Sequence, residues 1–330
     1  MSGAPLDVVG VGNAIVDVIA QAEPALLERL ALNKGTMTLI EAADADRLYG
    51  EMGSGRETSG GSAANTLAGV ASLGGRGAYI GKVRDDQLGK VFSHDIKAVG
   101  VDYRLRPATS GPSTARCLIF VTPDADRTMQ TYLGVSVMLG PDDIDPQAIG
   151  DAQITYLEGY LFDRDEAKEA FVKAAELAHA AGRKVALSLS DPFCVGRHRA
   201  SFRHLVEGHI DILFANHDEI TSLYETDSFD KAVASVVGQV DIAAVTRGAK
   251  GSVIVTANEL IEIPAEPVEK VVDTTGAGDL YAAGVLYGIT QGYELQLAGR
   301  IGSICAAEVI SHYGARPEAS LAKLVQAKLG

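Results

Sequence analysis

Basic residues are scarce in this sequence. Its 330 residues include 29 Lys and Arg against 43 Asp and Glu, so the formal net charge is -14. Proteins that bind a nucleic-acid backbone normally present a basic stripe. The charge therefore argues against a nucleic-acid partner, although a local pocket could still bind a small anionic ligand.

Closely spaced cysteines and long apolar runs are also lacking. Cys117, Cys194 and Cys305 lie far apart and form no CxxC pair, which argues against a disulfide framework or a zinc site and favours a reducing compartment. No apolar run approaches the ~20 residues that span a bilayer. The first 20 residues lack a basic start and carry Asp7 and Asp17, so they predict a strand rather than a signal peptide. We expect a cytoplasmic protein with no membrane partner.

From about residue 150 the sequence alternates between two patterns. Short apolar runs such as "ITYLEG", "KVALSLS" and "DIAAVTRG" are separated by amphipathic helical stretches. This alternation predicts βαβ units and a parallel sheet covered on both faces. The expected fold class is α/β, a doubly wound, mostly parallel sheet flanked by helices.

The first third of the sequence reads differently. Strand-like segments at 36–40, 78–83, 114–122 and 127–133 follow one another with few helices, and "TPDADR" (122–127) predicts a hairpin turn. They suggest a small β element that projects from the main sheet. We expect one domain over 1–330, with a β-sheet lid built from segments within about 13–60 and 100–135.

The segment "DTTGAGDLYAAG" (273–284) carries the strongest chemical signal. Gly276, Ala277 and Gly278 precede an apolar helical run, and a helix N-terminus exposes unpaired N–H groups that bind anions. Asp279 in the first turn would face the same space, where a carboxylate could take a proton from a hydroxyl group. The alternative is that Asp279 only complements the helix dipole, with Gly276 as a turn residue.

Two glycine-containing segments predict a binding site for a sugar. In "GNAIVD" (12–17), Asp17 and Asn13 could hold neighbouring hydroxyl groups, or Asp17 could simply cap a turn. A dinucleotide fingerprint would need a third glycine where Ile15 stands, and a helix where the pattern continues as a strand. In "SGGSAAN", a polar Asn65 follows two glycines, Gly60 and Gly61, that could form a hinge; close helix packing explains the small residues equally well.

Two further segments follow predicted strands. In "NHDE", Asn216 and Glu219 supply oxygen ligands that suit Mg²⁺, or they form an N-cap and its capping-box partner. "TRGAKGS" (246–252) lacks P-loop spacing, but the backbone at Thr246 and Gly248 could line a nucleotide. A simple turn is the alternative.

In this order along the chain, the segments resemble those of the ribokinase-like (PfkB) carbohydrate kinase family. The matching segments run from residue 12 to residue 317, and they are "GNAIVD", "GGSAAN", "GKVRDDQLG", "NHDE", "TRGAKG", "DTTGAGD" and "GARP". The resemblance implies a ribokinase-like fold with a lid over the active site. It also implies transfer of the γ-phosphoryl group of ATP to a primary hydroxymethyl group.

The resemblance also implies roles for particular residues. Asp279 would be the catalytic base, beside an anion hole formed by the backbone of Gly276, Ala277 and Gly278. The remaining roles concern the ligands: Asn13, Asp17 and Asn65 would hold the substrate, Gly60 and Gly61 would form the lid hinge, Asn216 and Glu219 would organise Mg²⁺ through water, and Thr246 and Gly248 would line the nucleotide.

Two implied roles come from less specific matches. Arg127, within "DADRT", would reach from the lid to the phosphates, unless it is only an exposed hairpin arginine. Asp273 and Thr275, with the "SHYGA" loop, would hold a monovalent cation such as K⁺ through backbone oxygens, as in some members of the family.

Within the family, "LSLSDPF" and "DILFANHDE" look closest to the adenosine kinase branch. Adenosine is therefore the first candidate substrate, and Leu39, Tyr160 and Phe162 could wall an adenine pocket or simply pack in the core. Ribokinase or fructokinase activity on a free sugar is the second candidate. A non-catalytic nucleoside-binding protein is a third, although the base and the anion hole are both intact. A monomer and a homodimer both fit the sequence.

Overall fold

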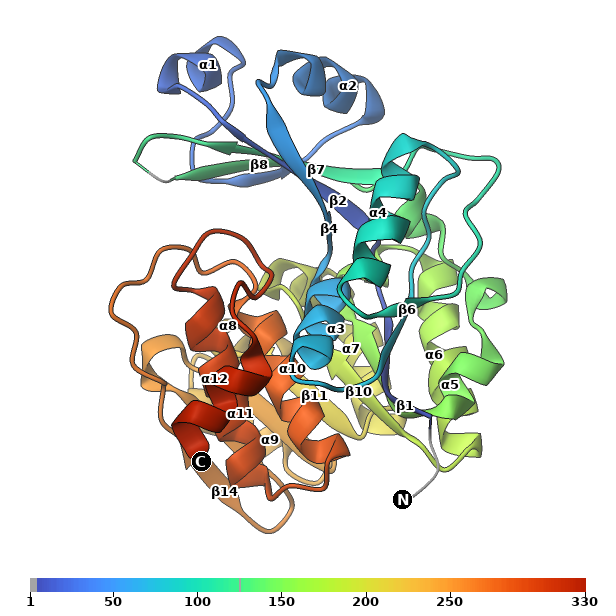
Figure 1. Cartoon of the computed structure of the whole chain (residues 1–330). Helices are drawn as coiled ribbons and strands as arrows, with labels where there is room; N and C mark the ends of the chain where they lie inside the picture. The colour runs from blue at the N-terminus through green and yellow to red at the C-terminus, as the bar shows by residue number, and fades with distance from the viewer. Residues whose placement is uncertain (1–4, 125) are drawn as a thin grey trace.

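Two β-sheets of unequal size organise the chain, as the computed structural model, which describes residues 5–124 and 126–330, shows (Figure 1). The larger sheet has nine strands in the order β14-β13-β12-β11-β10-β9-β1-β5-β6, and the smaller has five in the order β3-β8-β7-β2-β4. The small sheet lies at one end of the molecule, and the C-terminus and the start of β1 lie at the opposite end (Figure 1).

The main sheet is parallel except at one edge, where β13 and β14 pair antiparallel. Strand β1 reads LDVVGV and is buried throughout, which is typical of a parallel strand covered on both faces. The expected α/β class is confirmed. The strands are β1 (Leu6–Val11), β5 (Gly77–Ile80), β6 (Asp102–Tyr103), β9 (Ala152–Glu158), β10 (Lys184–Ser188), β11 (Ile212–Asn216), β12 (Ile242–Thr246), β13 (Ser252–Val255) and β14 (Leu260–Ile263).

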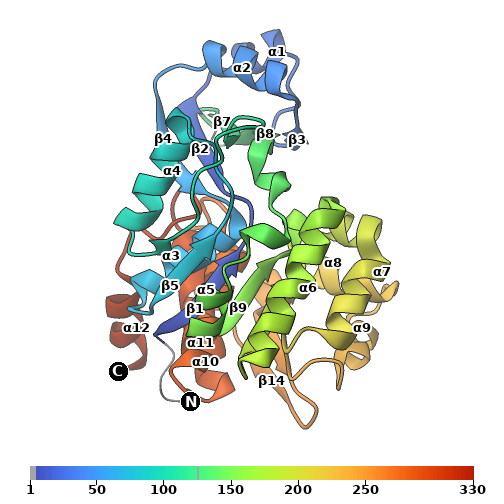
Figure 2. The ribbon, with the colours of Figure 1, turned by 90° about the vertical axis from the view of Figure 1, so that its right-hand side faces the viewer.

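Helices cover both faces of this sheet (Figure 2). One layer comprises α5 (Pro146–Asp151), α6 (Asp165–Ala180), α7 (Pro192–Gly208), α8 (His217–Tyr224) and α9 (Phe229–Val236). The other comprises α3 (Ser62–Ser72), α4 (Gln87–Ala98), α10 (Ala277–Thr290), α11 (Leu295–Val309) and α12 (Leu321–Leu329). Short 3₁₀ turns occur at η1 (Gly134–Met138), η2 (Pro141–Asp143), η3 (Gly159–Asp163) and η4 (Gly248–Lys250). In the described part of the chain, no helix is both long and apolar enough to cross a membrane.

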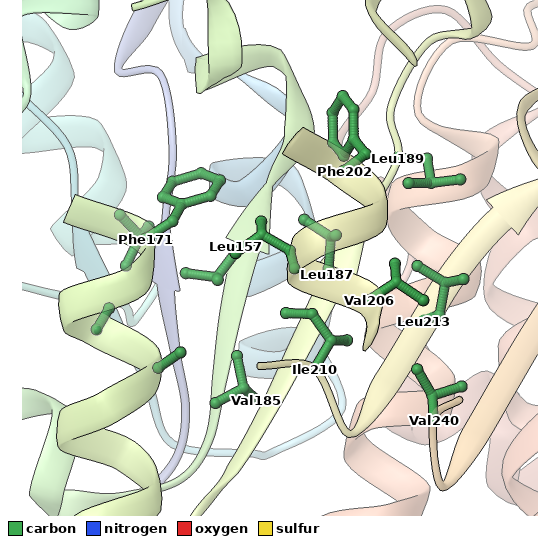
Figure 3. Packing of buried hydrophobic residues seen from close by; sticks show 14 of the residues in the cluster. Leu157, Phe171, Val185, Leu187, Leu189, Phe202, Val206, Ile210, Leu213 and Val240 are labelled. Atoms are coloured by element: carbon green, nitrogen blue, oxygen red, sulfur yellow. The ribbon is translucent and has the colours of Figure 1, made fainter. Parts of the chain in front are cut away.

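The core between the sheet and the first helical layer is built from aliphatic strand residues and aromatic helix residues (Figure 3). Leu157 and Leu187 lie on adjacent parallel strands and pack beneath Phe171 of α6 and Phe202 of α7. Helix α6 buries Ala170, Phe171, Ala174 and Ala178 along one face, which is the spacing of an amphipathic helix. This packing fixes where the carboxyl ends of β9 and β10 stand.

The small sheet is assembled from two separated stretches of chain. Its strands are β2 (Ile15–Gln21), β3 (Met37–Leu39), β4 (Gly55–Gly60), β7 (Ala115–Val121) and β8 (Arg127–Tyr132). Strands β7 and β8 pair antiparallel, with Val121 opposite Arg127, as the hairpin prediction requires; residue 125 of that turn lies outside the described residues. Helices α1 (Pro24–Arg29) and α2 (Ala42–Glu51) lie over its outer side (Figure 1).

Two expectations for the first third were wrong. The strand expected at 78–83 is β5, which pairs with β1 in the main sheet and does not belong to the small element. All four of its residues are buried, because the chain returns through helix α3 and β5 pairs parallel with β1 inside the main sheet. The region also contains three helices, α1, α2 and α4, that the sequence analysis did not predict; α1 has only six residues, too few for a clear helical period.

Candidate active site

A cavity of about 1040 Å³ lies where the carboxyl ends of the main-sheet strands face the small sheet. Its lining includes Asn13 after β1, Glu158 at the end of β9, Asn216 at the end of β11 and Thr246 at the end of β12. The strand order runs outward in both directions from β1 and β9, so the cavity opens at a topological switch point of the sheet, where open α/β sheets bind ligands.

Asp279 is held in this cavity by two donors from another helix. The Ser62 hydroxyl donates to Oδ1 at 2.6 Å, and the Asn65 amide donates to Oδ2 at 3.0 Å. Burial raises the pKa of Asp279, while these two hydrogen bonds and the charge of Arg316 work against that rise. The carboxylate is therefore fixed in orientation and more basic than an exposed aspartate. The sequence assigned Asn65 to the substrate and did not predict this contact; its Oδ1 is buried and has no partner among the described residues.

The residues before Asp279 form a tight turn into α10. Gly276 is the N-cap with φ of 79°, and a Cβ there would lie 2.8 Å from the Cα of Ala315. Among the described residues, the amides of Gly276 and Gly278 have no hydrogen-bond acceptor, whereas Ala277 N donates to Thr274 O at 3.2 Å. Unpaired amides at the start of a helix are the groups that bind anions.

Asp17 reaches the cavity from the small sheet. It lies on β2 opposite Thr58, and a side chain at Gly60 would overlap its carboxylate. Burial raises the pKa of Asp17 to about 6, despite the opposing charges of Arg316 and Arg127. Gly60 and Gly61 join β4 to α3, so they connect the small sheet to the body.

Glu158 is a site residue that the sequence analysis missed. Its Oε1 accepts from the backbone N and the amide of Asn13, at 3.2 and 3.0 Å, and its Oε2 accepts from Ala63 N at 2.8 Å. Burial raises the pKa of Glu158 to about 7. Asn13 is held on its other side by the Ser136 hydroxyl at 2.9 Å. Only the fold brings β1, β9 and α3 together here, because the partners lie far apart in sequence.

Asn216 and Glu219 form the capping box of α8 and also line the cavity. Asn216 Oδ1 accepts from Glu219 N at 2.9 Å, and both oxygens of Glu219 accept from Asn216, at 2.9 and 2.7 Å. The pKa of Glu219 is raised to about 7, mainly by burial and to a smaller extent by the charges of Asp191, Asp218 and Asp279. The described residues contain no group of three or more His, Cys, Asp or Glu side chains placed to hold a metal ion directly.

The residues expected near the nucleotide separate into two groups. Thr246, Gly248 and Thr275 line the cavity, together with Arg247. Arg127 and Asp273 are not among its lining residues, and they form an ion pair with each other at 2.8 Å. Arg127 is therefore not an exposed hairpin residue, since its side chain is almost fully buried.

Arg316 lies in the "GARP" segment, for which the sequence predicts no side-chain role. Its Nη2 donates to the backbone oxygen of Ser59 at 2.8 Å and to its hydroxyl at 2.9 Å, while Nε and Nη1 are buried without an acceptor among the described residues. Its charge lowers the pKa of both Asp17 and Asp279. It thus links the C-terminal loop to the end of β4.

The structure decides between a pocket wall and core packing for the three candidates for a base pocket. Phe162 is 1% exposed and stacks on Phe202 in the core, with ring centroids 4.4 Å apart, so it does not reach the cavity. Tyr160 and Leu39 do line it. Phe193, which the sequence analysis missed, lines the cavity at 77% exposure. It is the second residue of α7, after Pro192, and its backbone N donates to the N-cap Asp191.

Comparison with known proteins identifies the family. The profile of the pfkB family carbohydrate kinases matches residues 33–321, so the chain belongs to this family. The solved structure of adenosine kinase from Sinorhizobium meliloti is 49% identical, with 98% of this chain and 100% of that chain covered and a TM-score of 0.91. A probable sugar kinase protein from Rhizobium etli CFN 42 is 47% identical, with 99% of each chain covered and a TM-score of 0.91.

A more distant relative is adenosine kinase from Saccharomyces cerevisiae, 26% identical over 333 residues, with 94% of this chain and 96% of that protein covered. The chain is thus a phosphotransferase that acts on a hydroxyl group, a kinase of the adenosine kinase or sugar kinase type. Kinases of this family use ATP and usually Mg²⁺.

The turn at Gly276 gives a stability prediction. Gly276→Ala should lower the free energy of unfolding by about 2 kcal/mol or more, because the left-handed φ and the overlap with Ala315 both penalise a side chain. Urea denaturation measures this. Gly278→Ala is the matched control, since a Cβ there meets no atom within 4 Å and should change stability little. Equal losses in the two variants would contradict this steric explanation for Gly276.

The raised pKa of Glu158 gives a pH prediction. A folded-state pKa of about 7, above the ordinary 4.5, means that the folded protein holds a proton that the unfolded chain releases between these values. The contribution of Glu158 to stability should therefore decrease as pH rises from about 4.5 to 7, by about 1.4 kcal/mol per unit of pKa shift. Glu158→Gln should remove this part of the pH dependence, measured by urea unfolding from pH 5 to 8, whereas the exposed-site control Glu259→Gln should keep the wild-type slope.

Proposed function

We propose that this chain transfers the γ-phosphoryl group of ATP to the primary hydroxymethyl group of a nucleoside, with adenosine as the first candidate. The observation that supports a nucleoside substrate is an apolar surface on the small sheet that lines the cavity. Ile15, Leu39, Cys117, Ile119 and Met129 line it there, and Leu39 is 52% exposed. A nucleobase would cover this surface, whereas a free sugar would leave it in water.

The polar groups below this surface suit the ribose. Asp17 offers a carboxylate that can accept two hydroxyl hydrogen bonds, and the unpartnered Oδ1 of Asn65 can accept another. The side-chain amide of Asn13 donates a hydrogen bond to Glu158. In this proposal Asn13 therefore orients the site, and it contacts the substrate only through hydrogen-bonding positions that Glu158 does not occupy. Similarity to the adenosine kinase from Sinorhizobium meliloti supports the same substrate.

In the reaction, Asp279 takes the proton of the hydroxymethyl group as its oxygen attacks the γ-phosphorus. The bond from that phosphorus to the bridging oxygen breaks, and ADP leaves. The amides of Gly276, Ala277 and Gly278 lie at the N-terminus of α10, where the helix dipole stabilises charge on the transferring group. The raised pKa of Asp279 suits a base that works near neutral pH. The small sheet acts as a lid that excludes water, with Gly60 and Gly61 as its hinge.

The residues around Glu219 fit Mg²⁺ that retains most of its water. Asp191, Asp218 and Glu219 all line the cavity. Burial, and to a smaller extent the charges of Asp191 and Asp218, raises the pKa of Glu219. Both oxygens of Glu219 already accept hydrogen bonds from Asn216, so contact through water is the arrangement these residues support. When bound with ATP, the ion neutralises phosphate charge. Thr246, Arg247 and Gly248 would line the nucleotide, and Nε and Nη2 of Arg127 are donors without a protein acceptor among the described residues.

A sugar kinase is the second candidate, because every polar contact proposed for the ribose of a nucleoside also suits a free furanose. Similarity to the probable sugar kinase protein from Rhizobium etli favours it. The two candidates share the catalytic residues and differ only in what covers the apolar surface.

The base assignment predicts a large loss in Asp279→Asn. We expect kcat to fall by about 10²–10⁴-fold, the usual contribution of a general base, with little change in ATP affinity. ADP release and nucleotide binding by fluorescence measure the two effects. Asp230→Asn, on the exposed side of α9, is the control for the same chemical change. Near-normal turnover in Asp279→Asn would remove Asp279 from this role.

The substrate is tested by ADP release from ATP and Mg²⁺, with adenosine, inosine, ribose, fructose and water offered separately. We expect turnover with adenosine, and a several-fold higher KM for adenosine in Leu39→Ser with an unchanged KM for ATP. Turnover with a sugar alone would favour the second candidate. Tight adenosine binding without turnover would favour a non-catalytic nucleoside-binding protein.

A further inference from the structure

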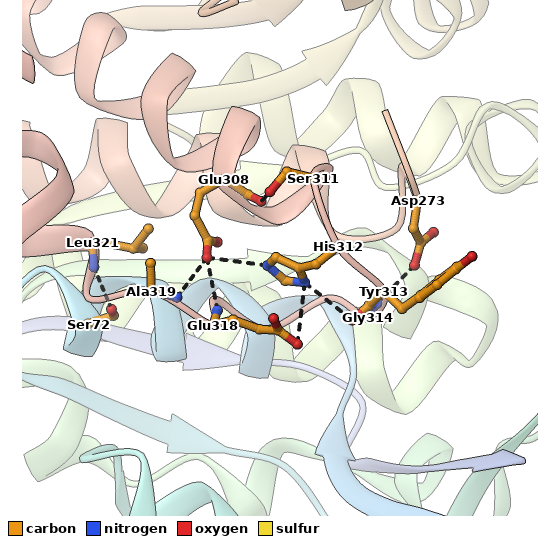
Figure 4. A network of polar contacts seen from close by, with 10 residues as sticks. All are labelled: Ser72, Asp273, Glu308, Ser311, His312, Tyr313, Gly314, Glu318, Ala319 and Leu321. Carbon is orange, nitrogen blue, oxygen red and sulfur yellow. Dashed lines mark hydrogen bonds and ion pairs between the residues drawn. The ribbon is translucent and has the colours of Figure 1, made fainter. Parts of the chain in front are cut away.

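The carboxylate of Asp273, at the start of the "DTTGAGD" segment, is surrounded by donors. Its Oδ1 accepts from the backbone N and the hydroxyl of Thr275, at 3.0 and 2.7 Å. Its Oδ2 accepts from Gly314 N at 2.9 Å, shown in Figure 4, and lies 2.8 Å from Nη1 of Arg127. A carboxylate has about four acceptor positions, so these contacts leave none for a metal ion.

Backbone oxygens around Asp273 are also engaged. The Ile310 oxygen accepts from the backbone N of Val272 and of Asp273, and the Thr274 oxygen accepts from Ala277 N. The Tyr313 oxygen lies 3.3 Å from Nδ1 of His312. Nε2 of His312 lies 3.3 Å from Oε1 of Glu308, and this oxygen accepts from the backbone N of Glu318 and Ala319 (Figure 4). The loop is thus braced by its own hydrogen bonds.

The cation that does meet Asp273 comes from the small sheet. Arg127 begins β8, and the side chains of Arg127 and Asp273 are 8% and 7% exposed. The ring of Tyr313 lies against the guanidinium, with its centroid 5.5 Å from Cζ. A buried ion pair with an aromatic face beside it holds its charge in place, because removal of either partner would leave an unpaired buried charge.

We propose that the guanidinium of Arg127 takes the place of a monovalent cation at Asp273, so that this chain does not need K⁺. The positive charge beside the loop that leads into α10 is then supplied by the small sheet. It is present when that sheet is seated on the body, and it cannot dissociate into solvent. Nε and Nη2 of Arg127 are buried and have no acceptor among the described residues.

The test compares K⁺ with tetramethylammonium at equal ionic strength. The first readout is the thermal unfolding midpoint without substrate, which rises when an ion binds the folded state. The second is ADP release with whichever of the offered acceptors the wild type phosphorylates. For the wild type we expect neither readout to respond to K⁺. For Arg127→Met we expect lower activity in tetramethylammonium, a several-fold recovery in K⁺, and a midpoint that K⁺ raises.

Matched variants make the result specific. Arg56→Met removes an exposed arginine from β4 of the same sheet and should behave as the wild type. Arg127→Met with Asp273→Asn should not recover in K⁺, because the anionic ligand is gone. Arg127→Gln repeats the test if Arg127→Met does not fold, and the wild-type measurement decides alone if neither variant folds.

Two results would overturn the proposal: a several-fold activation or a raised midpoint of the wild type in K⁺, or a folded Arg127 variant with no response to K⁺. The activity readout rests on the proposed function, whereas the unfolding midpoint needs no substrate. A chain that phosphorylates none of the offered acceptors would therefore leave the cation test intact.

Discussion

The hydrogen bonds from Ser62 and Asn65 to Asp279 are the contact on which the rest of the site depends. They join α3 to the first turn of α10 across more than 200 residues of sequence, and α3 continues directly from the small sheet through Gly60 and Gly61. A buried carboxylate is costly unless donors satisfy it. The position of the small sheet, the orientation of the base and the start of α10 are therefore set by one junction.

This junction explains the small side chains of α3. Gly69 faces α10 so closely that a Cβ would lie 2.6 Å from the Cβ of Ala283 and 2.7 Å from Leu280. Larger residues would push the two helices apart and draw Asn65 away from Asp279. The close packing of α3 on α10 and the hydrogen bond from Asn65 to Asp279 therefore depend on the same short distance between the two helices.

The sequence predicted what depends on local pattern. The alternating strands and helices after residue 150 follow from periodicity, and the turn at Gly276 follows from its residue types. It could not predict contacts made only by the fold, such as that of Glu158 with Asn13, 145 residues away, or that of Arg316 with Ser59. It also left open whether Phe162 lines the cavity or packs in the core, and it missed Phe193, because an aromatic side chain near a strand end has no pattern that shows which way it points.

For several residues the sequence left two explanations open: a structural role such as a helix cap, or a role in binding a ligand. The structure often shows the structural role, and the same residue still faces the cavity. Asn216 and Glu219 form a capping box, and the same hydrogen bonds hold the Glu219 carboxylate at the cavity wall. Asp279 is an acidic residue in the first turn of α10, where the helix dipole favours it, and it also faces the cavity.

A capping interaction costs little and fixes a polar side chain at the end of an element. Since the carboxyl ends of parallel strands meet at one edge, the caps of the following helices converge there. A site of this kind is preorganised by the same contacts that begin its helices, so a cap and a ligand contact are not competing explanations for such a residue.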